Sequence, residues 1–67
     1  MPSVQRRHVH SRPRARLILI ETQPPLLPDG VTIKRWATVR GVVFEEHIAP
    51  NGVIHWFKIE NGAPPIG

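Results

Sequence analysis

Residues 42–60, VVFEEHIAPNGVIHWFKIE, carry the local signals on which the predicted fold depends. In its first half, four alternate positions share one parity: Val42, Phe44, Glu46 and Ile48. Such alternation is typical of a half-buried strand. Pro50-Asn51-Gly52 is a strong turn signal, and residues 53–59 are rich in β-branched and aromatic side chains. Local rules therefore predict a β-hairpin over residues 42–59.

A helix over residues 50–61 is the alternative. Pro50 would stand near its first position, and Asn61-Gly62 followed by Pro64-Pro65 would end it. The helix would place four side chains on one stripe: Val53, Trp56, Phe57 and Glu60. Gly52 in the first turn would cost about 1 kcal/mol relative to alanine. Pattern alone therefore favours the hairpin.

Just before this stretch, residues 31–41 carry helix signals. Thr32 can cap an unpaired amide of a first turn, and Gly41 suits the left-handed stop after a last turn. Three side chains fall on one helical face: Ile33, Trp36 and Ala37. We expect a short helix over residues 33–40.

The N-terminal part is less regular. Residues 1–14 offer little to bury, which predicts a disordered basic arm. Residues 15–21, ARLILIE, predict a short strand, and the three prolines of residues 22–30 indicate a connector. Residues 15–67 then form one small domain.

Composition excludes several classes of protein. The 67 residues include no cysteine, which excludes disulfides and thiolate zinc sites. The longest apolar run, residues 17–20, is too short to cross a bilayer, so we expect a cytoplasmic protein. So short a chain has little room for catalysis or a cofactor, and the adjacent carboxylates of Glu45-Glu46 should point to opposite sides. His8 and His10 are too few to hold a metal.

Positive charge is concentrated near the N-terminus. Residues 1–16 hold five arginines and no acid, whereas residues 17–67 hold four cations and five acids. An arginine-rich segment of this kind is a common electrostatic footprint for phosphate backbones. The charge pattern thus predicts a nucleic-acid partner.

Two segments resemble the small excisionases of phages and integrative elements, the lambda-type and Cox-like recombination directionality factors related to MerR-type winged helices. Residues 31–37, VTIKRWA, look like the first-helix motif of that family. Val53, Trp56, Phe57 and Lys58, closed by residues 62–66, GAPPI, look like its recognition helix and Pro-Pro turn. This resemblance replaces the hairpin with a second helix.

The resemblance implies an α+β fold: a helix-turn-helix or reduced winged-helix domain with one or more short strands. We expect the wing that follows Pro64-Pro65 in that family to be missing or to be replaced by the strand near residues 15–21. The implied function is sequence-specific binding of double-stranded DNA, bending attachment sites to direct an integrase or other recombinase toward excision. Cooperative self-association on DNA and promoter repression would accompany that binding.

Candidate DNA contacts follow from this interpretation. The second helix would present three side chains to the bases: Asn51, His55 and Lys58. The first helix would present three cations to phosphates: Lys34, Arg35 and Arg40. The arm would add five more: Arg6, Arg7, Arg12, Arg14 and Arg16.

A different hypothesis keeps the hairpin. With strands at residues 15–21, 42–48 and 53–59, the chain would be a small β-rich interaction module that binds and modulates a host protein. Cross-strand pairing between the last two segments distinguishes the two hypotheses.

Overall fold

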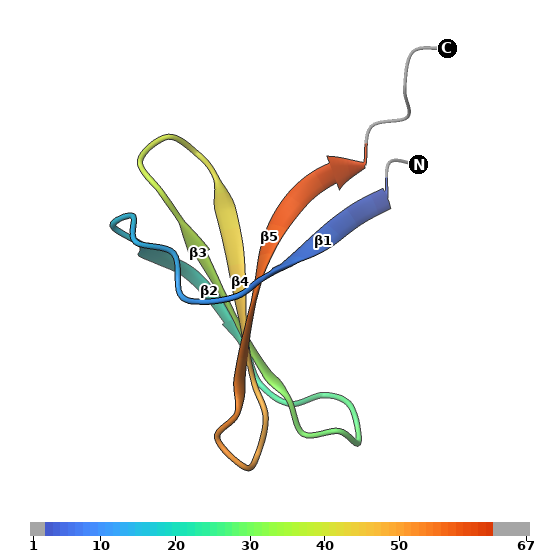
Figure 1. Ribbon diagram of the computed structural model, residues 1–67. Helices are drawn as coiled ribbons and strands as arrows, with labels where there is room; N and C mark the ends of the chain where they lie inside the picture. Colours follow the sequence, from blue (N-terminus) through green and yellow to red (C-terminus); the bar gives the residue numbers. More distant parts are fainter. Residues whose placement is uncertain (1–2, 63–67) are drawn as a thin grey trace.

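A five-stranded antiparallel sheet makes up the fold (Figure 1). The computed structural model describes residues 3–62. The strands are β1 (Ser3–Val9), β2 (Ile18–Gln23), β3 (Thr32–Ala37), β4 (Val43–Ile48) and β5 (Ile54–Gly62). Their order across the sheet is β1-β5-β4-β3-β2, so β1 and β2 are the edges. Residues 3–62 contain no helix, and therefore none that could span a bilayer.

The predicted α+β helix-turn-helix or winged-helix fold is wrong in both of its helices. Residues 32–37 form β3, which pairs with β2 on one side and β4 on the other. Ile33 and Ala37 lie on one face of the sheet and Trp36 on the other, so the helical stripe does not exist. An eight-residue helix is marginal in water, whereas pairing on both sides satisfies the strand's backbone groups.

The second predicted helix is replaced by the hairpin that the local pattern favoured. β4 and β5 pair with Ile48 opposite Ile54. Their turn is closed by hydrogen bonds from the Gly52 amide to the Ala49 carbonyl and from the Ala49 amide to the Val53 carbonyl, each 2.9 Å. Gly52 has a φ of 89°, which a three-residue hairpin loop requires at its last position.

The β3–β4 turn is built in the same way, which explains the misleading helix stop. Gly41 has a φ of 84°, and its amide donates to the Thr38 carbonyl at 2.9 Å, while the Thr38 amide donates to the Val42 carbonyl at 2.9 Å. A left-handed glycine ends a helix and also completes this type of hairpin loop. The left-handed conformation expected of Gly41 is therefore present, but the element that it follows is the strand β3.

The prediction of a disordered arm at residues 1–14 is wrong for residues 3–9, which form β1, while residues 1–2 lie outside the described residues. Ser3–Val9 pairs with β5 along its whole length, from Ser3 opposite Gly62 to Val9 opposite Trp56. β5 has nine residues and its side away from β4 would otherwise carry unpaired amides and carbonyls. Backbone pairing, rather than apolar burial, thus explains why such a basic segment is ordered.

The pleat gives the sheet two faces with different chemistry. The tryptophan face carries a row that crosses all five strands: Leu19, Trp36, Phe44, Lys58 and Arg7. The glutamate face carries the adjacent row: Glu21, Arg35, Glu45, Phe57 and His8. Among the described side chains, one apolar residue is fully buried, Trp56 at 7% exposed, on the tryptophan face.

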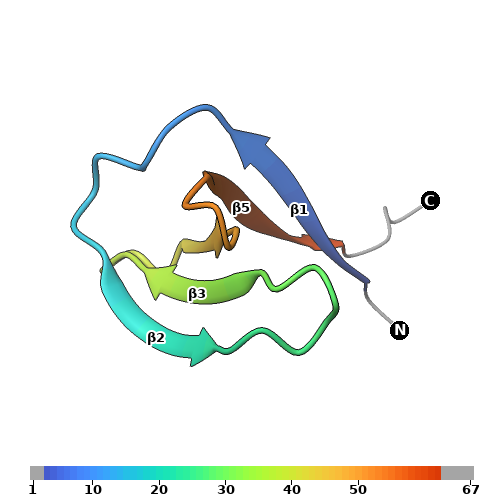
Figure 2. The same ribbon diagram turned by 90° about the horizontal axis from the view of Figure 1, so that it is seen from below.

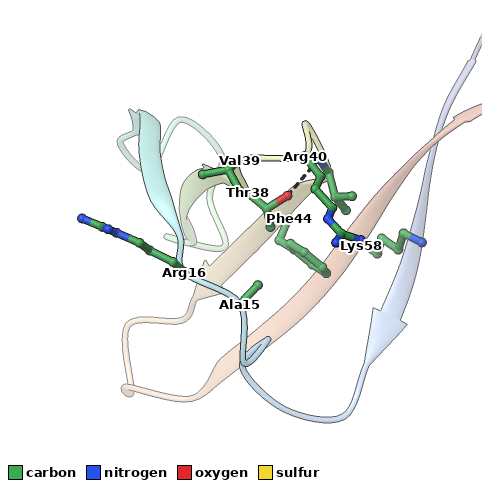
Figure 3. A pocket seen from close by; sticks show the side chains of 8 residues that line it. Ala15, Arg16, Thr38, Val39, Arg40, Phe44 and Lys58 are labelled. Carbon is green, nitrogen blue, oxygen red and sulfur yellow. Dashed lines mark hydrogen bonds between the residues drawn. The ribbon is translucent and has the colours of Figure 1, made fainter.

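The link from β1 to β2, residues 10–17, connects the two edges of the curved sheet (Figure 2). It places Ala15 beside Phe44, so it passes over the tryptophan face (Figure 3). The link therefore brings Arg16 to the same cavity as Phe44 of β4 and Lys58 of β5.

Candidate functional site

Glu45 is the centre of the glutamate face. Its side chain is almost completely buried, with the residue 1% exposed, and three side chains donate to it. Arg6 Nε lies 2.7 Å from Oε1, His47 Nε2 lies 2.9 Å from Oε1, and Arg35 Nε lies 2.9 Å from Oε2. Arg35 also pairs with Glu21 on the edge strand β2. One carboxylate thus joins β1, β3 and β4.

The network keeps Glu45 ionised. Burial alone raises the pKa of a carboxyl group, but hydrogen bonds from Arg6, His47 and Arg35 outweigh it and lower the pKa of Glu45 to about 2. A buried carboxylate loses its hydration, and here each hydrogen-bond donor compensates part of that loss. Such a group stabilises the packing of the strands that supply the donors. Glu45 therefore serves the fold rather than proton transfer.

Three of the predicted DNA contacts are engaged by acids. Arg6 and Arg35 are held by Glu45, and Arg7 lies 3.5 Å from Glu60. The first two are positioned by the network on the glutamate face. Arg7 is 69% exposed in its side chain, so this pair is weak.

The remaining predicted cations have no acid within 4.0 Å in residues 3–62: Arg12, Arg14, Arg16, Lys34, Arg40 and Lys58. Lys34 lies opposite Glu46 in the strand register, so a carboxylate is its neighbour on the tryptophan face. The other five belong to the link, the β3–β4 turn and β5. Arg6 and Arg35 are thus paired on the glutamate face, whereas the cations of the link, the β3–β4 turn and β5 have no acid partner within 4.0 Å in residues 3–62.

A cavity of about 470 Å³ brings three of these cations together. Its lining residues are Ala15, Arg16, Thr38, Val39, Arg40, Val42, Phe44 and Lys58. None of them is acidic, and four are apolar: Ala15, Val39, Val42 and Phe44. Figure 3 shows Phe44 between Ala15 and the β3–β4 turn, with Arg40 directed toward it. Arg16 and Lys58 extend outward on opposite sides (Figure 3).

The β3–β4 turn fixes the place of Arg40. The Thr38 hydroxyl accepts a hydrogen bond from the Val42 amide at 3.2 Å, in addition to the backbone bonds that close the loop. Arg40 stands immediately before Gly41, in this hydrogen-bonded turn. Its position beside Phe44 therefore follows from the turn geometry rather than from a helix.

The other predicted base contacts lie elsewhere. Asn51 is in the β4–β5 turn, where its side-chain oxygen accepts from the Val53 amide at 3.0 Å. His55 is on β5, with Nδ1 3.3 Å from Nε2 of His8. Neither residue lines the cavity beside Lys58, so the predicted triad of Asn51, His55 and Lys58 is not brought together.

The two adjacent glutamates point to opposite faces, as expected from the pleat. Glu45 is bound on the glutamate face, whereas Glu46 accepts from Trp36 Nε1 at 3.1 Å on the tryptophan face. They therefore do not form an acid–base pair. In the described part of the chain, no group of three or more metal-ligating side chains is gathered.

Sequence reasoning missed the uncharged part of the cavity: Ala15, Thr38, Val39, Val42 and Phe44. These residues come from the link, a turn and a strand, and only the fold joins them. The one local signal was the left-handed glycine at position 41, which marks the turn. Comparisons of the chain with protein-family models, curated proteins and solved structures find no match.

Proposed function

We propose that the protein binds nucleic acid through phosphate groups held on its tryptophan face and β1–β2 link. The observation that carries this proposal is the cavity in which Arg16, Arg40 and Lys58 meet without an acid among the lining residues. Uncompensated cations gathered on one surface attract a polyanion and release its counterions on binding.

The rest of the charge distribution supports this choice. Arg6 and Arg35 are compensated by Glu45 and Glu21 on the opposite face. Arg12 and Arg14 belong to the same link as Arg16. A polyanion would therefore meet positive charge on the side of the cavity and a compensated network on the other side.

Excisionase activity remains a prediction that rests on residue resemblance. Its major-groove helix has no counterpart in residues 3–62, and residues 63–66 of the resemblance lie outside the described residues. DNA bending, an integrase partner, self-association on DNA, promoter repression and a cytoplasmic location likewise remain predictions. The proposal keeps the nucleic-acid partner and assigns it to a sheet face.

The test is fluorescence anisotropy with labelled duplex DNA, single-stranded DNA and single-stranded RNA at two salt concentrations. The triple variant Arg16→Gln, Arg40→Gln, Lys58→Gln should flatten the slope of log K against log salt by about 2–3, since each phosphate contact contributes about 0.7–0.9. Lys34→Gln, beside Glu46, is the single-site control and should change the slope by less than one third of the change in the triple variant. No binding of any probe at low salt would refute the proposal.

One observation favours a second candidate function, the protein-binding module. The edge strand β2 exposes three consecutive apolar side chains: Ile18 at 54%, Leu19 at 47% and Ile20 at 57%. An exposed edge of this kind can accept a strand from another protein. Capture of a protein partner without nucleic acid, lost on Ile18→Lys, would favour this function.

A further inference from the structure

We infer that the cavity on the tryptophan face receives one unpaired base of a single nucleic-acid strand, which stacks on Phe44. This inference rests on the proposed function and names the form of nucleic acid that the site takes. Its basis is the combination of an apolar aromatic floor with cations on both sides of it.

The lining has the chemistry of a base site. Ala15, Val42 and Phe44 supply an apolar surface, and the volume of about 470 Å³ lies within the roughly 300–1,000 Å³ typical of small-molecule sites. A phosphate alone would need no aromatic floor. A base has a π-face that stacks on aromatic rings regardless of its identity.

The cations fit the backbone on either side of that base. Arg16 and Lys58 extend in opposite directions from the rim, and Arg40 lies toward Phe44 (Figure 3). A strand that crosses the cavity would offer one phosphate to each side while its base enters between them. With no carboxylate in the lining, charge complementarity selects an anionic occupant.

A duplex fits this arrangement less well than a single strand. Its bases are stacked and paired, so one could enter the cavity only after extrusion, which costs a few kcal/mol. On a sheet surface, aromatic side chains commonly stack the unpaired bases of single strands. The occupant is therefore a single strand rather than a duplex.

The site should tolerate any base. The Thr38 hydroxyl, the neutral polar side chain of the lining, already accepts the Val42 amide. Beyond the three cations assigned to the phosphates, this hydroxyl is the one side-chain polar group of the lining that can read the edge of a base. Stacking and phosphate contacts together give affinity with weak sequence preference.

The experiment compares three labelled probes by anisotropy at one low salt concentration: a 12-nucleotide oligothymidine, an abasic strand of equal length, and a 12-base-pair duplex. We expect the oligothymidine to bind roughly 5- to 150-fold more tightly than the abasic strand, the range that one stacked base contributes. The duplex should bind more weakly than the oligothymidine.

Variants assign the effect to the cavity. Phe44→Leu should weaken oligothymidine binding and leave abasic binding unchanged, whereas Phe57→Leu on the glutamate face should change neither. Circular dichroism checks that both variants fold. The comparison of probes on the unaltered protein does not depend on them.

Each of the other outcomes would refute one particular component of the inference. Equal binding of the abasic strand and oligothymidine would refute the base site and leave the proposed function standing. Tighter binding of the duplex would refute the choice of a single strand. Competition by thymidine monophosphate at the affinity of the oligothymidine would replace the strand with a free nucleotide. Failure of all probes would refute the proposed function itself.

Discussion

Arg6 on β1 reaches across β5 to Glu45 on β4, with 2.7 Å between Nε and Oε1. The side chain of Glu45 is 2% exposed, and that of Arg6 is 40% exposed. This contact fastens an edge strand to the centre of the sheet. It links β1 directly to β4, two strands that share no backbone pairing, through residues 39 positions apart in the sequence.

Replacing Glu45 should destabilise the fold strongly. Glu45→Gln removes the charge that compensates Arg6 and Arg35, and breaking a buried pair typically costs 3–5 kcal/mol. We expect the free energy of unfolding in urea to fall by about 3 kcal/mol. Glu60→Gln, which loses a 3.5 Å pair with Arg7, is the control and should cost less than about 1 kcal/mol. Equal losses would contradict a special role for Glu45.

The same carboxylate makes stability depend on acidity. Because the pKa of Glu45 falls from its usual 4.5 to about 2 in the folded protein, its contribution is complete above pH 4.5 and disappears as the pH falls toward 2. The shift corresponds to about 3 kcal/mol. Urea unfolding from pH 7 to 2 measures this. The difference between the unaltered protein and Glu45→Gln should shrink over that window, and a constant difference would contradict the assignment.

These contacts also show which parts of the fold local sequence patterns can predict. The turn at residues 50–52 and the alternation from Val42 to Ile48 predicted the β4–β5 hairpin. The family resemblance of residues 31–37 and of the segment around Trp56 then favoured helices, although Trp36 and Trp56 both lie in paired strands. Gly41 could not distinguish a helix from a strand before it, because helix ends and hairpin loops both use a left-handed glycine.

Long-range partners account for what local patterns missed. From its own composition, the arginine-rich segment is predicted to be disordered. It is ordered because Arg6 pairs with Glu45, 39 residues away, and because its backbone pairs with β5. The cavity is likewise assembled from Arg16, Arg40 and Lys58 on three separate elements. The positive charge near the N-terminus therefore predicted a polyanion partner. It did not reveal which arginines form ion pairs within the fold.

β1 makes the N-terminal segment a structural part of the domain. A chain lacking residues 1–9 should lose the β1–β5 ladder and leave the side chain of Glu45 with fewer donors. We expect a lower melting temperature by circular dichroism. Arg6→Gln should reproduce part of the loss, and Arg12→Gln in the link should not. An unchanged melting temperature in the truncated chain would contradict this role of β1.

At the hairpin glycines Gly41 and Gly52, an added methyl group would meet no steric clash, but it would strain the backbone because φ is positive. At Gly52 an added Cβ would meet nothing within 4 Å, so the cost of Gly52→Ala arises from the φ of 89° alone. We expect a loss of about 1 kcal/mol, measured by urea unfolding. Gly52→Asn, which accepts left-handed geometry better, should lose less. If alanine and asparagine cost the same, backbone strain is not the cause.

The open edge of β2 should make the protein self-associate as its concentration rises. Ile20 lies at the bulge between Leu19 and Glu21, where the pairing with β3 shifts register, and it is 57% exposed. A charge on an edge strand opposes pairing with a second edge. Ile20→Lys should therefore lower the weight-average mass in sedimentation velocity while changing stability by no more than about 0.5 kcal/mol. Leu26→Lys, 73% exposed in the β2–β3 loop, adds the same charge away from the edge and should leave association unchanged. An equal effect of both variants would point to net charge rather than the β2 edge.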